Sequence, residues 1–108
     1  MQKQYKSMRL LAMASLIFLG VSPSVASERY WKDGQQAYTQ VCAYCHNIGV
    51  GPDSVKIKFP DDAVAFRTNN IIQVVRHGLN AMPAFRKTEI DDATLRDLAH
   101  GLATGKIK

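Results

Sequence analysis

The pentapeptide Cys42-Ala43-Tyr44-Cys45-His46 is the part of the chain whose residue types and spacing could carry chemistry. Residues three apart lie on one face of a helix, so both thiols can reach the two vinyl groups along one edge of a haem. The adjacent His46 then directs an imidazole toward the iron. The motif predicts covalent attachment of one haem c, with thioether bonds from Cys42 and Cys45 and His46 as an axial iron ligand.

Other uses of two cysteines remain open at this point. A thioredoxin-like redox pair would also show the Cys-x-x-Cys spacing, but it requires a βαβ context that this sequence lacks. A structural zinc site needs four ligands, and the chain has only two cysteines. A thiol redox or metal-binding module is therefore the alternative if no haem is attached.

Met82 is the predicted second axial ligand. It lies in Asn80-Ala81-Met82-Pro83, just past a predicted helix end and 36 residues after His46, which is enough chain to wrap a haem. Pro83 stiffens the extended segment that would hold the sulfur over the iron, and His/Met ligation raises the iron potential. His77 and His100 are the rival ligands. An iron left open on this side would instead suit a peroxidase or a gas-binding protein.

A ligating histidine normally donates its other ring nitrogen to an acceptor that fixes the ring orientation. For His46 the backbone carbonyl of Pro52 is the candidate.

No strand-like alternation is present, and three helical stretches must position these residues. They are expected at about residues 33–42, at about residues 70–77 after an Asn69 cap, and from an Asp91 cap through Leu102. Residues 47–67 are expected to form a long loop, so the predicted fold is small and all-α.

Residues 1–26 have the pattern of an export signal. Lys3, Lys6 and Arg9 precede an apolar run over residues 10–21, and small residues follow. Twelve residues of helix span about 18 Å, too short for the roughly 30 Å core of a bilayer, so a retained anchor is disfavoured. We expect cleavage after Ala26, a single domain over residues 27–108 without a membrane span, and a periplasmic location.

The basic charge is largely a property of this leader. The whole chain of 108 residues carries 14 basic and 9 acidic residues, a net charge of +5. Residues 1–26 contain three of the basic residues and no acidic one, so +2 remains. No basic stripe with interleaved aromatic residues is left, which argues against a nucleic-acid partner.

The sequence resembles the class I c-type cytochromes, and the resemblance covers nearly all of residues 27–108. It rests on Gly34, Tyr38, Cys42, Cys45 and His46 in family spacing, on Gly51-Pro52, on Met82-Pro83 and on a C-terminal amphipathic helix. The resemblance implies three to four helices wrapped around one covalent haem, with the ligands given above. The family usually has an aromatic residue on the last helix where this chain has Gly101, so that contact between the first and last helices is missing.

Further matches lie at Tyr38, Val41-Cys42, residues 49–52, Val75-Arg76, Gly78, residues 81–85 and Asp91-Asp92. On these residues the chain is similar, within that family, to the cytochrome subunits of the p-cresol methylhydroxylase type. The similarity implies a non-catalytic subunit that accepts single electrons from an FAD-containing dehydrogenase of 4-alkylphenols and passes them to a downstream acceptor.

The expected rim of the haem edge, residues 43–44, 50–51 and 81–85, contains no charged residue. An uncharged rim favours a long-lived complex, whereas a lysine-ringed edge is typical of diffusing shuttles. A free periplasmic shuttle is the alternative.

Overall fold

The computed structural model describes residue 20 and residues 29–108, so the predicted signal segment lies outside the described residues except for Gly20. The described chain is helical, and its one β-type pairing is an isolated bridge between Leu79 and Met82. The predicted all-α class is confirmed. The elements are α1 (Gly34–Ala37), a π-helical turn η1 (Tyr38–Cys42), α2 (Ala43–His46), two 3-10 turns η2 (Asp53–Lys56) and η3 (Asp61–Ala63), α3 (Val64–His77) and α4 (Asp92–Ala103).

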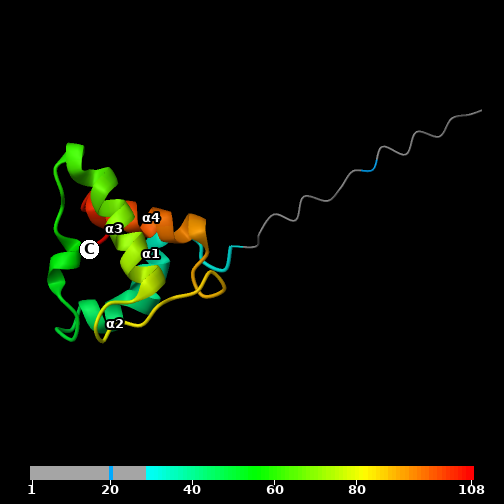
Figure 1. Ribbon diagram of the computed structural model, residues 1–108, viewed down its shortest axis with the longest axis horizontal. Coiled ribbons are helices and arrows are strands. Elements are labelled where there is room, and N and C mark those ends of the chain that lie inside the picture. Colours follow the sequence, from blue (N-terminus) through cyan, green and yellow to red (C-terminus); the bar gives the residue numbers. More distant parts are fainter. Residues whose placement is uncertain (1–19, 21–28) are drawn as a thin grey trace, which may run out of the picture.

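Figure 1 shows the helices gathered into one globule, with the green 47–63 connection along one side and the yellow 78–91 connection along another. Helix α4 contacts both α1 and α3. Its buried face packs against Tyr38 and Val75 in a single apolar core. Among the described residues, no helix has the length and hydropathy needed to cross a bilayer.

The first helical run is longer than the sequence indicates. It begins after Asp33, whose carboxylate accepts a 2.8 Å hydrogen bond from the Gln36 amide. The predicted end at Cys42 is wrong, because η1 and α2 continue the run to His46. In η1 the amide of Ala43 donates to the Tyr38 carbonyl five residues earlier. This wide turn ends at Cys42, the first residue of the Cys-x-x-Cys-His motif, and such π-bulges are frequent at functional sites.

The second helix, α3, also starts earlier than predicted. It begins at Val64 rather than near Asn70, so Asn69 lies inside it and the predicted 47–67 loop is too long. The predicted loop includes Asp61 and Asp62. They form the η3 turn instead, where acidic side chains suit the N-terminal end of a helix.

Helix α4 follows the prediction closely. The Asp91 carboxylate accepts a 3.0 Å hydrogen bond from the Thr94 amide. Ile90 and Leu95, on either side of this cap, are each 1% exposed, as expected of a hydrophobic staple.

Gly34 sets the crossing of α1 and α4. A Cβ atom at this position would lie 2.6 Å from the Leu98 Cα atom, so only glycine allows this approach. The Gly34 amide also donates a 2.7 Å hydrogen bond to the Asp97 carboxylate on α4. The first and last helices therefore meet backbone to backbone.

We predict that Gly34→Ala lowers the unfolding free energy of the holoprotein by about 1–3 kcal/mol, the usual cost of overpacking a tight contact. Denaturant titration followed by circular dichroism measures the change. Gln35→Ala is the matched control, because Gln35 is an exposed neighbour on the same helix. Equal stabilities of the two variants would contradict the close crossing.

Gly101 contacts the C-terminal residues of the chain, not the first helix, which the family's aromatic residue at this position contacts. Its carbonyl accepts hydrogen bonds from the amides of Lys106 and Ile107 at 2.8 and 3.1 Å, as the chain turns back after Gly105. A Cβ atom on Gly101 would lie 2.7 Å from Ile107 Cδ1. The chain thus places Ile107, 4% exposed, against the last helix.

Candidate functional site

Both cysteines and His46 lie at the end of the first helical run. Cys42 is the last residue of η1, and Cys45 and His46 belong to α2. Cys42 packs against the core, whereas Cys45 is exposed. One cysteine of the motif is therefore held by packing, and the other faces outward.

The thiol of Cys42 is unlike that of a redox-active cysteine. Burial, together with the nearby Cys45, raises its pKa to about 11. Reactive thiols have a depressed pKa because the thiolate is the nucleophile. Cys42 is therefore not placed as an attacking thiolate.

The chain after the motif turns back and contacts the His46 ring. The amide of Gly51 donates a 2.7 Å hydrogen bond to the carbonyl of Cys45. The Nδ1 atom of His46 then lies 3.0 Å from the carbonyl oxygen of Pro52. With Nδ1 protonated and donating to this carbonyl, Nε2 keeps the lone pair that a metal would bind.

Gly51 makes this arrangement possible. A Cβ atom at position 51 would lie 2.9 Å from His46 Nδ1 and 3.0 Å from Cε1. A side chain there would push the imidazole away from Pro52. The sequence showed Gly51 as part of a family motif without indicating this steric role.

Met82 lies in a tight turn after α3. Its amide donates to the Leu79 carbonyl at 2.9 Å, and the Leu79 amide donates to the Met82 carbonyl at 3.1 Å. Gly78 permits the turn, since it has a φ of 76° and a Cβ atom there would lie 2.7 Å from the Met82 carbonyl oxygen. The Met82 side chain is half-buried and packs against the same apolar core as Cys42.

The rival histidines occupy other environments. The ring of His77 is exposed, and its Nδ1 lies 2.9 Å from the carbonyl of Gln73 on its own helix. His100 lines a wide groove of about 830 Å³ with Arg29, Arg96 and residues of α3. The lining of that groove includes neither the cysteines, His46 nor Met82.

The described residues fit a haem in polarity as well as in donor atoms. Along the sequence from the motif to the Met82 turn, several large apolar side chains are more than half exposed: Tyr44, Ile48, Val50, Ile57, Phe66 and Leu79. Exposed apolar surface on this scale is typical of a site that is covered by a ligand or partner.

Arg67 is a second feature of the described residues that suits a bound haem. Its guanidinium lies 5.1 Å from the centre of the Phe59 ring, and Nη1 donates to Asn70 Oδ1 at 3.2 Å. Its Nε atom is buried and has no hydrogen-bond partner among the described residues. A haem propionate is an acceptor of the kind that this donor requires. No sequence motif marked Arg67.

Comparison with known proteins is consistent with this geometry. The family model described as cytochrome C oxidase, cbb3-type, subunit III matches residues 29–100. The chain belongs to this cytochrome c family. Its members bind covalent haem c, and the curated relatives are cytochromes.

Two curated relatives are informative. The cytochrome c subunit of 4-cresol dehydrogenase [hydroxylating] from Pseudomonas putida is 31% identical over 80 residues, which cover 72% of this chain and 65% of the relative's length. Cytochrome c6 of Thermostichus vulcanus is 27% identical over 103 residues, which cover 92% of this chain and 88% of that protein.

The chain is also similar to a solved structure. A chain in the crystal structure of p-cresol methylhydroxylase with substrate bound superposes with a TM-score of 0.55 at 35% identity. The match covers 68% of this chain and 92% of that chain.

Proposed function

We propose that one haem c is held by thioether bonds from Cys42 and Cys45, with His46 and Met82 as the axial ligands of its iron. The observation that carries this assignment is the His46 ring oriented 3.0 Å from the Pro52 carbonyl, next to a cysteine that shares its core with Met82. Pro52 orients the imidazole, and Arg67 neutralises a propionate. When bound, the haem supplies a one-electron iron couple.

The chain's own residues keep the geometry constant during electron transfer. Gly51 and Pro52 limit rotation of His46, and the hydrogen bonds between Leu79 and Met82 limit movement of the thioether. The exposed apolar side chains of Ile48 and Leu79 would help to keep water from a bound haem. A site that changes little between oxidation states exchanges electrons with little rearrangement.

The proposed partner is the flavin-containing subunit of a dehydrogenase that acts on 4-alkylphenols, and this chain accepts its electrons one at a time. The relative from Pseudomonas putida supports this role. The rim residues 43–44, 50–51 and 81–85 carry no charge, and Tyr44 and Val50 are 72% and 75% exposed. A projecting apolar rim suits a lasting interface.

A free electron shuttle is the second candidate, and the similarity to cytochrome c6 favours it.

Both roles require export, and we infer that residues 1–26 direct the chain to the periplasm and are then removed. Mass spectrometry of the mature protein tests this, with a mass beginning at Ser27 as the expected result. Retention of residues 1–26 would contradict it.

The two roles differ in how the complex responds to salt and to rim mutations. The purified holoprotein is mixed with the flavin subunit of 4-cresol dehydrogenase, and binding and 4-cresol-dependent haem reduction are measured. We expect a complex whose affinity changes little with ionic strength, because its rim is apolar. Val50→Lys should weaken it about tenfold or more, since a charge is then desolvated at the interface.

Ala93→Lys is the matched control, because it places the same charge on an exposed position of α4. Reduction that falls steeply with salt, without a stable complex and with equal effects of the two lysines, would support the shuttle instead. Either result leaves the haem ligation untouched.

A further inference from the structure

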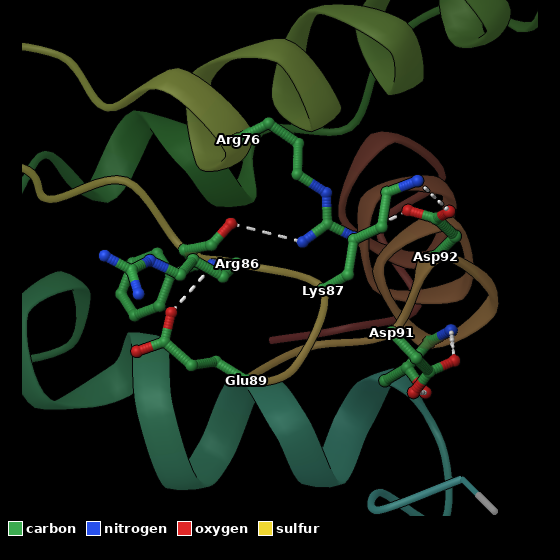
Figure 2. Close-up of polar contacts among 8 residues, drawn as sticks. Arg76, Arg86, Lys87, Glu89, Asp91 and Asp92 are labelled. Carbon is green, nitrogen blue, oxygen red and sulfur yellow. Dashed lines mark hydrogen bonds and ion pairs between the residues drawn. The ribbon is translucent and has the colours of Figure 1, made fainter. Parts of the chain in front are cut away.

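Arg76 connects three parts of the molecule, one of which carries Met82. It lies in the last turn of α3, and its side chain is only 15% exposed. Nη1 donates to the carbonyl of Phe85 at 3.2 Å, and Nη2 donates to Asp92 Oδ1 at 2.8 Å. Figure 2 shows this guanidinium between the connection that carries residues 85–89 and the start of α4. One side chain therefore bridges α3, α4 and the segment between them.

The segment in question, residues 78–91, is hereafter the Met82 segment. At its beginning the Leu79 and Met82 backbones bond to each other. Three residues after Met82, the amide of Phe85 donates to the Val75 carbonyl at 2.8 Å while its own carbonyl accepts from Arg76. Both polar groups of the Phe85 backbone are thus held by α3, and Pro83 stiffens the short span between these two anchors.

The chemistry of this contact requires an arginine. A planar guanidinium presents several N–H donors in fixed directions, so one group can serve a carbonyl and a carboxylate together. A lysine ammonium is a compact charge without that fork. Asp92 is well suited as the second partner because it opens α4, and Lys87 Nζ also lies 3.1 Å from its Oδ2.

Most of the stabilisation should come from the Phe85 contact rather than from the ion pair. The Asp92 side chain is 62% exposed, and exposed ion pairs contribute little. The bond to the Phe85 carbonyl is half-buried and fixes backbone directly. Lys87, 75% exposed, touches the same carboxylate without holding any backbone group, which makes it a natural comparison.

We propose that Arg76 is a positioning residue for Met82. The Arg76 side chain holds the Met82 segment against α3 and α4, so that the thioether stays on the iron. This inference rests on the assignment of Met82 as an axial ligand made above. Without the clamp, the segment opens more often and the sulfur leaves the iron more easily.

The test compares the ferric holoproteins of wild type, Arg76→Gln and Lys87→Gln. Two readouts are used: the weak near-red absorption band of a methionine-ligated ferric haem, and the rate at which added cyanide displaces the methionine. We expect about tenfold faster displacement in Arg76→Gln, the consequence of one lost half-buried hydrogen bond. Lys87→Gln should match wild type.

Arg76→Lys is the second variant, for the case in which Arg76→Gln yields no holoprotein. It keeps the charge but not the fork, and we expect an intermediate rate. A wild-type protein that shows the near-red band, with all three variants displaced at the wild-type rate, would overturn the clamp and leave the ligand assignment intact. A wild-type protein without the band would refute the ligand assignment itself.

Discussion

Cys42→Ala combined with Cys45→Ala should abolish the holoprotein and leave a largely unfolded chain. The folded core is formed mainly by α3, α4 and the first helical run, and it is small. Ile48, Ile57, Phe66 and Leu79 lie outside it, each more than half exposed. A domain of this size is stable by about 5–15 kcal/mol at most, so losing the group that covers these side chains removes most of that margin.

Haem staining after denaturing electrophoresis and far-ultraviolet circular dichroism together measure this result. The control is Tyr44→Ala, because Tyr44 lies between the two cysteines but is 72% exposed. It should retain covalent haem and the full helical signal. A double cysteine variant that keeps native helicity and unfolds cooperatively would contradict the claim that haem completes the core.

Met82→Leu should open the iron without unfolding the protein. Leucine conserves the volume of a side chain that packs against the core, so the change in packing should cost less than about 1.5 kcal/mol, apart from the loss of the iron–sulfur bond. The missing sulfur removes the near-red band and permits rapid binding of cyanide or carbon monoxide. The midpoint potential should fall on the order of 0.1 V, within the wide range over which axial ligands tune haem.

His77→Ala and His100→Ala are the controls for the Met82 variant. His77 already contacts a carbonyl of its own helix, and His100 lines the groove beside α4. Both variants should keep the wild-type band and potential. Loss of the band in either one, with Met82→Leu unchanged, would reassign the sixth ligand to that histidine.

Local signals in the sequence predicted some features well. Asp91 predicted the start of α4, because a capping side chain acts over only a few residues. The spacing of Cys42, Cys45 and His46 similarly predicted a helical motif, and these residues do lie in η1 and α2.

Other features depend on contacts that a local pattern cannot reveal. Asp61 and Asp62 suit either a loop or the N-terminal end of a helix, and the buried Thr68, whose hydroxyl donates to the Val64 carbonyl at 2.8 Å, belongs to the longer α3. The contact of Gly101 with Ile107 and the two contacts of Arg76 join residues through space. No local sequence pattern around Gly101 or Arg76 indicates these contacts.

A spectroelectrochemical titration of the purified holoprotein tests whether this chain is a cytochrome that carries single electrons with His46 and Met82 on the iron throughout. The expected result is one reversible one-electron transition, with a six-coordinate low-spin haem in both oxidation states and no binding of carbon monoxide by the reduced form. A five-coordinate, high-spin reduced haem that binds carbon monoxide rapidly would contradict that ligation and indicate an open-site haem protein.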